Sequence, residues 1–206
     1  MREILLTSYE FLTSIVPYLV VSWIWKRTHP QALPTARSRM ALVLVFAFYV
    51  TTVFHLTGAG TLYDALLYQL EFRPDWINLI PFSSAIDVTG YLQNVLLFVP
   101  FGILVPLLWR SMDSPVHIAG SALAFSLLIE LSQLLNPRRT DIDDLILNTL
   151  GALAGYVIFR LLHRMVRPGA QLRSDTGLLP AVCVLFAGRF LFFYEMAMAK
   201  LLYGFS

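Results

Sequence analysis

Long apolar stretches alternate with short polar connections along the chain. Six such stretches lie at about residues 9–25, 40–59, 91–109, 116–135, 143–163 and 178–203. A helix needs about 20 mostly apolar residues to cross the hydrocarbon core of a bilayer. The pattern therefore predicts an all-α, polytopic integral membrane protein: a helical bundle with five to six transmembrane helices.

The composition supports this class of protein and argues against others. Apolar residues make up 57% and charged residues 14% of the 206 positions, whereas soluble domains carry about 25% charged residues. No internal repeat or low-complexity run divides the chain, so residues 1–206 are expected to form a single membrane domain. The single cysteine, Cys183, allows neither an intrachain disulfide nor a cysteine-based metal site. No basic patch interleaved with aromatic residues is present, which argues against a nucleic-acid partner.

The positions of lysine and arginine predict the orientation, because cytoplasmic connections are enriched in these residues. The first, third and fifth connections are expected in the cytoplasm and carry Lys26, Arg27, Arg37, Arg39, Arg110, Arg164, Arg167 and Arg173. The second and fourth connections and both termini are expected outside and carry Arg2, Arg73, Arg138, Arg139 and Lys200. The first stretch lacks an A-x-A-like cleavage site, so we expect it to stay as a helix rather than be removed as a signal peptide.

One connection, about residues 60–90, is longer than the others. It is interrupted by Pro74 and Pro81 and contains the short apolar run Trp76-Ile-Asn-Leu-Ile-Pro-Phe82. A run of this length cannot span a bilayer. An interfacial or re-entrant segment is therefore expected around residues 74–88, on the outer side.

A polar run interrupts the apolar pattern at Glu130–Asn148. On a helix that begins near Pro115, the side chains of Ser126, Glu130 and Gln133 share one face. A carboxylate inside an apolar helix costs about 3 kcal/mol on insertion scales, so Glu130 should face protein or a wet cavity. Asn136-Pro137 should end this helix, because proline cannot continue it.

The next helix carries a second polar face. Thr140 or Asp141 is expected to cap it, and Asp141, Asp144 and Asn148 form a stripe that continues through Gly151 and Gly155. The two glycines would let another helix approach closely. Asp143 falls off this stripe and is expected to contribute least. Since the turn between the two helices is short, Glu130 and Gln133 should meet this stripe near the outer membrane boundary.

At the outer end of the third stretch lies Asn94, on the same side as Asn78. The sequence therefore predicts a polar pocket where the third, fourth and fifth helices meet under the segment Asn78–Phe82. Each of these groups also has a simpler interpretation. Glu130 could pair with Arg138, Arg139 or Arg189 and hold helices together. The aspartates could form a solvated helix start, and the asparagines could form hydrogen bonds between helices.

These motifs, in this order, resemble the VanZ-like family of bacterial membrane proteins. The resemblance covers about residues 75–160 and rests on Asn78-Leu-Ile-Pro-Phe82, Asn94-Val-Leu-Leu-Phe-Val-Pro-Phe-Gly102, Ile129-Glu-Leu-Ser-Gln133, Arg138-Arg-Thr-Asp-Ile-Asp-Asp144 and Asn148-Thr-Leu-Gly151. It implies a role in the cell envelope, connected with resistance to the glycopeptide teicoplanin. Of the two adjacent arginines, Arg138 is favoured over Arg139 for the family role.

Two functions follow as expectations. In the first, the pocket binds a membrane lipid or lipid-linked envelope precursor through Asn78, Asn94, Gln133, Asp141 and Asn148. In the second, the protein is an intramembrane enzyme in which Glu130 is a general acid or base, Arg138 holds a phosphate or carboxylate, and Asp144 binds a metal or orients water. A transporter is disfavoured, because no inverted repeat is visible.

No cofactor is expected from the sequence. The histidines His55, His117 and His163 are scattered and share no face, which argues against metal binding by histidine. Glu130, Asp141 and Asp144 offer the hard oxygen ligands that Mg²⁺ or Ca²⁺ prefers, which keeps a divalent cation open as an alternative.

Overall fold

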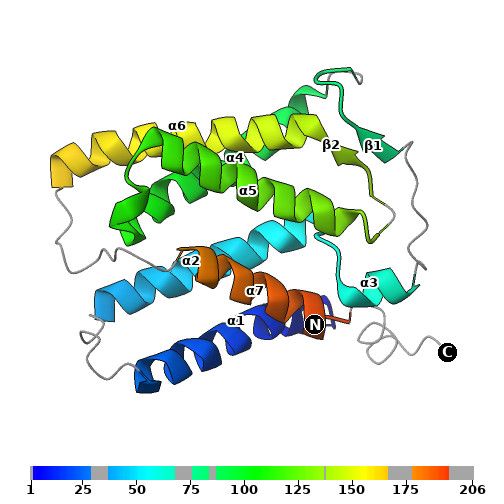
Figure 1. Cartoon of the computed structure of the whole chain (residues 1–206), viewed down its shortest axis with the longest axis horizontal. Coiled ribbons are helices and arrows are strands. Elements are labelled where there is room, and N and C mark those ends of the chain that lie inside the picture. The colour runs from blue at the N-terminus through cyan, green and yellow to red at the C-terminus, as the bar shows by residue number, and fades with distance from the viewer. Residues whose placement is uncertain are drawn as a thin grey trace.

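The chain folds as a bundle of helices that lie side by side (Figure 1). The computed structural model describes residues 2–28, 37–67, 76–83, 87–136, 138–166 and 178–194. The helices are α1 (Arg2–Thr28), α2 (Arg37–Thr57), α3 (Leu62–Leu67), α4 (Val88–Leu108), α5 (Pro115–Gln133), α6 (Ile142–Val166) and α7 (Leu178–Phe192), with a 3₁₀ turn at Arg110–Met112. The predicted all-α helical bundle is confirmed.

Several of these helices have the length and apolarity of membrane spans. Among the described residues, four stretches meet both conditions: Arg37–Leu67, Val88–Leu108, Pro115–Gln133 and Ile142–Arg164. The N-terminal helix α1 has 27 residues and contains Glu10 and Pro17, and α7 is a shorter apolar helix of 15 residues. A membrane protein is thus confirmed, and a fifth and sixth span by α1 and α7 stay a prediction. Helix α7 ends at Phe192, whereas the apolar pattern had predicted a helix to about residue 203; residues 195–203 lie outside the described part of the chain.

Glycines bring the backbones of α4 and α6 into direct contact. A Cβ atom placed on Gly151 would lie 2.1 Å from the carbonyl oxygen of Val95, and one on Gly155 would lie 2.0 Å from that of Val99. From the opposite helix, Gly102 meets the Ala152 carbonyl in the same way, at 1.9 Å. The predicted close approach along Gly151 and Gly155 is confirmed, and α4 is its partner.

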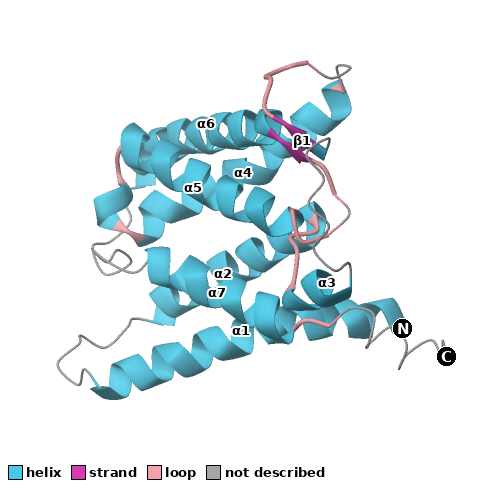
Figure 2. Ribbon diagram, turned by 45° about the vertical axis from the view of Figure 1, so that its right-hand side comes forward, coloured by secondary structure: helices cyan, strands magenta, loops and turns pink. Residues whose placement is uncertain are grey.

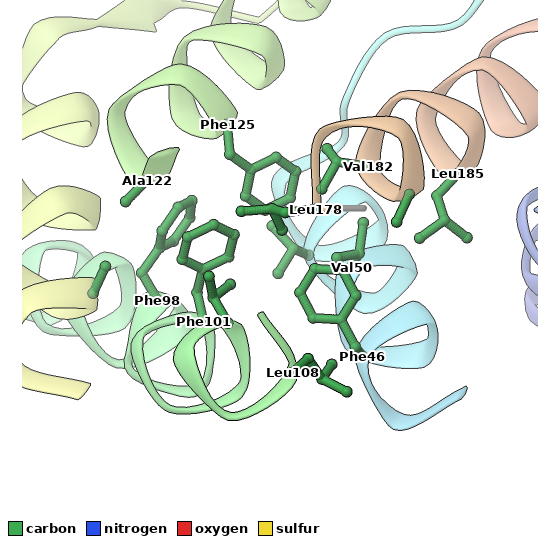
Figure 3. Packing of buried hydrophobic residues seen from close by; sticks show 14 of the residues in the cluster. Phe46, Val50, Phe98, Phe101, Leu108, Ala122, Phe125, Leu178, Val182 and Leu185 are labelled. Carbon is green, nitrogen blue, oxygen red and sulfur yellow. The ribbon is translucent and has the colours of Figure 1, made fainter. Parts of the chain in front are cut away.

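An aromatic core joins this pair to the other helices (Figure 3). The ring of Phe125 in α5 stacks on Phe101 of α4, with centroids 5.5 Å apart, and meets the edge of Phe54 of α2 at 5.6 Å. From α7, Leu178, Val182 and Leu185 pack into the same buried cluster. This apolar core therefore holds α2, α4, α5 and α7 together.

Two short strands, which the periodicity did not predict, tie one end of the bundle together. Strand β1 (Ile77–Asn78) pairs in parallel with β2 (Thr140–Asp141), with Ile77 opposite Thr140 and Asn78 opposite Asp141. Figure 2 shows β1 against the end of the bundle where α6 begins. We call residues 77–83 the strap. Its tip is apolar and open, since Leu79 and Ile80 are 69% and 68% exposed.

Candidate functional site

Four carboxyl side chains gather where the end of α5 meets the start of α6, and we call Glu130, Asp141, Asp143 and Asp144 the carboxyl cluster. Glu130 and Asp143 are both 2% exposed, and the other two are partly buried. Glu130 Oε2 accepts the backbone N–H of Asp141 at 3.1 Å. The carboxyl groups of Glu130 and Asp144 are close enough to interact electrostatically. Glu130 therefore meets the polar face of α6, as predicted, whereas Gln133 donates to Thr57 instead.

The local sequence explains this geometry. Helix α5 ends at Gln133, and the chain turns through Leu134–Asn136, with the Leu135 N–H donating to the Ser132 carbonyl. Asp141 Oδ1 then accepts the backbone N–H of Asp143 at 3.0 Å and caps α6, as predicted. Because the connection is this short, Glu130 in the last turn of α5 faces the first turns of α6.

Amide side chains from two elements, β1 and α4, hold two of the carboxylates. Asn78 Nδ2 donates to both oxygens of Asp141, at 3.1 and 3.2 Å, and Asn94 Nδ2 of α4 donates to Asp144 Oδ1. One turn deeper, Asn148 Nδ2 donates to Ser126 Oγ at 2.9 Å. Asn78 and Asn94 thus bond to members of the carboxyl cluster, whereas Asn148 forms a separate pair with Ser126.

Asp143 is the residue that sequence reasoning undervalued. Its Oδ1 accepts the backbone N–H of Phe82 at 2.8 Å, and its Oδ2 accepts the Tyr91 hydroxyl at 3.0 Å. Phe82 has a left-handed backbone with φ of +55°, which an L-residue adopts only when its surroundings hold it there. Asp143 lies off the stripe of Asp141 and Asp144, but the strap covers that side. Helical spacing alone could not reveal a cover contributed by a distant segment.

Arg138 and Gln133 lie apart from the carboxyl cluster. Both donate to the carbonyl oxygen of Thr57 at the end of α2, each at 2.8 Å. The Arg138 guanidinium lies against Gly58, where an added Cβ would be 2.5 Å from Cζ. The expected arrangement, with Arg138 beside Glu130 in one pocket, is therefore not the one observed.

The cluster is held by neutral donors. In the described part of the chain, no ion pair joins any of the four carboxyl groups to an arginine, lysine or histidine. Of the alternatives left open by the sequence, a pair between Glu130 and Arg189 is not formed, because Arg189 pairs with Glu10 of α1 at 2.8 Å. Among the described residues, the buried acceptors Gln133 Oε1 and Asn148 Oδ1 have no hydrogen-bond partner.

A metal ion would need several of these groups to converge. Among the described residues, no three His, Cys, Asp or Glu side chains form a group that could hold one. The carboxylates are instead directed at separate partners: Asp141 at Asn78, Asp143 at Phe82 and Tyr91, and Asp144 at Asn94.

Apolar helices of membrane-spanning length, with buried carboxyl groups at one end of the bundle, define an α-helical integral membrane protein. A family model described as VanZ/LLP1 matches residues 40–163, and the chain belongs to this VanZ-like family. All four members of the carboxyl cluster lie inside the match, whereas α1 and α7 lie outside it.

One curated relative is similar over much of its length. Protein VanZ of Enterococcus faecium is 27% identical over 121 residues, which cover 58% of this chain and 74% of the relative. No solved structure matches the chain.

Proposed function

We propose that the protein binds the head group of a lipid-linked envelope precursor, or a related amphiphile, at the carboxyl cluster, and that it thereby lowers the susceptibility of the cell to teicoplanin. One observation carries this proposal: four carboxyl groups meet at the end of the membrane helices, and neutral donors rather than basic side chains hold them. Membership in the VanZ-like family supports the link to glycopeptides.

The chemistry of the cluster favours particular head groups. Carboxylates accept hydrogen bonds, so hydroxyl groups of sugars and ammonium groups of a peptide stem are the best partners. Arg138 is exposed at the same end and uses one guanidinium nitrogen for Thr57. Its remaining N–H groups suit a phosphate or carboxylate of the same ligand. The distribution of basic residues favours the extracytoplasmic side for this end.

An enzymatic role is the second candidate, and it rests on two buried or partly buried carboxyl groups, Glu130 and Asp144, that lie close enough to interact electrostatically. In such a pair a state in which one carboxyl group carries a proton is favoured, because two negative charges would repel each other. Such a pair offers an acid and a base side by side, which is what general acid–base catalysis on a lipid-linked precursor would need.

Teicoplanin susceptibility of a sensitive host tests both roles. Wild type, Glu130→Gln and Asp144→Asn would be compared at matched membrane levels, with Asp113→Asn as control, because Asp113 is a partly buried carboxylate at the other end of the bundle, hydrogen-bonded to Tyr156. Binding predicts a partial loss of resistance in Glu130→Gln and no change in the mass of lipid-linked precursors. Catalysis predicts complete loss of resistance in Glu130→Gln, together with a precursor mass change that the wild type produces and Glu130→Gln does not.

The control variant and the wild type show whether a loss of resistance is specific to the carboxyl cluster. Asp113→Asn should behave as wild type in both assays. If Glu130→Gln and Asp144→Asn also match the wild type, the carboxyl cluster is not the site. If the wild type confers no resistance, the proposed link to teicoplanin does not hold for this protein.

A further inference from the structure

A second group of ionisable side chains joins α1, α2 and α7, and two of its three members lie outside the family match. Arg189 Nε of α7 donates to Glu10 Oε1 of α1 at 2.8 Å, and both side chains are buried. The other oxygen of Glu10 lies 2.6 Å from Nδ1 of His55 in α2. Three helices are therefore joined by one carboxylate.

Arg189 also reaches the backbone of the connection between α2 and α3. Its Nη1 donates to the carbonyl oxygen of Ala59. Ala59 belongs to Thr57–Thr61, the segment that leads from α2 to α3, and we call these five residues the link. Arg189 thus holds the link from the side of α1 and α7.

The other side of the link is held by the end of α5. The Thr57 carbonyl accepts from Gln133 Nε2 at 2.8 Å, the Gly58 carbonyl from Asn136 Nδ2 at 2.9 Å, and the Gly60 N–H donates to Ser132 Oγ at 3.0 Å. The contact is also tight, because a Cβ on Gly60 would lie 2.0 Å from the Ser132 carbonyl oxygen. The link therefore cannot shift without moving the last turn of α5.

That last turn carries Glu130. We infer that Arg189, neutralised by Glu10, is a positioning residue for the carboxyl cluster: it fixes the link, and the link fixes the turn of α5 from which Glu130 reaches Asp141. This inference depends on the proposed function only in the experiment that measures resistance; the hydrogen-exchange experiment is independent of it.

Arginine is specifically suited to this role. Its planar fork donates from Nε to Glu10 and from Nη1 to the Ala59 carbonyl at once, in two fixed directions. A lysine at this position keeps the charge that Glu10 needs but cannot make both bonds. Arg189→Lys therefore separates the positioning of the link from the pairing of charge.

Hydrogen exchange measured by mass spectrometry on the full chain in lipid nanodiscs tests the inference. The variants are Arg189→Lys and Glu10→Gln, with Arg160→Lys as control, because Arg160 pairs with Asp113 at the other end of the bundle. Both test variants should raise exchange at the Gly60 amide and at the Asp141 amide, which donates to Glu130, by about tenfold, the factor for one lost hydrogen bond of ordinary strength. Amides of the α4–α6 contact at Gly151–Gly155 should not change.

The outcomes separate this inference from the proposed function. Faster exchange at the link with an unchanged Asp141 amide would overturn the inference, as would faster exchange throughout the helices. If Glu130→Gln lowers resistance while Arg189→Lys leaves both resistance and Asp141 exchange unchanged, the positioning role fails alone. If the wild type confers no resistance but the exchange pattern is as expected, only the proposed function fails.

Discussion

At the scale of single residues, Asp143 joins the strap to the start of α6. Its two oxygens accept from the Phe82 backbone and from the Tyr91 hydroxyl, and its side chain is buried. Asp143→Ala would leave the Phe82 N–H without a partner, whereas Asp143→Asn keeps one acceptor. We expect Asp143→Ala to lower the free energy of unfolding by about 1–3 kcal/mol and Asp143→Asn to lower it less.

Thermal unfolding in detergent, followed by tryptophan fluorescence, measures this effect. Limited proteolysis adds a local readout, because a released strap should be cleaved before the helices unfold. Wild-type stability and wild-type cleavage in Asp143→Ala would show that the strap does not depend on this carboxylate.

Arg138 provides a second test at the residue scale. It is exposed, and one guanidinium nitrogen donates to the Thr57 carbonyl. If its fork also holds an anionic group of the ligand, Arg138→Lys should weaken resistance by about fivefold to tenfold, because lysine cannot bind bidentately. The neighbouring exposed Arg139, substituted to lysine, is the matched control. Equal resistance in both variants would mean that only positive charge is needed there.

Spacing along the chain predicted part of this network and could not predict the rest. Glu130, Asp144 and Asn148 lie near in sequence and on regular helices, so their meeting followed from helical geometry and a short turn. The partners of Asp143 and Arg189 lie 61 and 179 residues away along the chain. Both Glu10 and Arg189 are charges inside apolar stretches, which suggests a mutual pair, but the sequence also offered Glu130 as a partner.

At the scale of elements, the contact between α4 and α6 leaves no room for a side chain at three glycines. Gly151→Ala would force its methyl group against the Val95 carbonyl, and the two helices would have to separate. We expect a loss of about 1–3 kcal/mol in the free energy of unfolding, the usual cost of overpacking. In contrast, Gly120 of α5 has nothing within 4 Å of an added Cβ.

Gly120→Ala is therefore the matched control for this substitution. It should be neutral or slightly stabilising, because alanine favours helix more than glycine does. The comparison uses thermal unfolding of both variants in the same detergent. Equal stability of the two would mean that α4 and α6 are not in backbone contact.

The six longer helices were predictable, because the length of each apolar stretch set their approximate bounds, whereas α3 (Leu62–Leu67) lies within the connection expected at about residues 60–90. The strap was only partly predictable. Its prolines and short length excluded a span, but its pairing with Thr140 and Asp141 depends on the chain folding back over the start of α6. Hydropathy carries no information about such pairing.

At the scale of the whole molecule, the polar groups are concentrated at one end of the bundle. The ends of α2 and α5 and the starts of α4 and α6 meet there, through bonds such as Gln133 to Thr57 and Asn94 to Asp144. The opposite end carries the exposed Arg110 and the Asp113–Arg160 pair. We expect the first end to face outward and the second to face the cytoplasm.

Labelling of single cysteines in intact cells measures this orientation. In a Cys183→Ser background, Arg139→Cys should react with a membrane-impermeant maleimide, and Arg110→Cys should react only after the cells are opened. The reverse pattern would place the carboxyl cluster on the cytoplasmic side and would remove the extracytoplasmic ligand from the proposal.

The pairing of Glu10 with Arg189 also bears on how the chain is made. The two residues are 179 positions apart. At about 5 to 20 residues per second, the ribosome adds the arginine roughly 10 to 40 seconds after the glutamate. During that interval α1 has left the ribosome with a carboxyl group whose arginine partner does not yet exist. Helix α1 can meet α2 early, through Glu10 and His55, but it completes its native contacts only after α7 has been made.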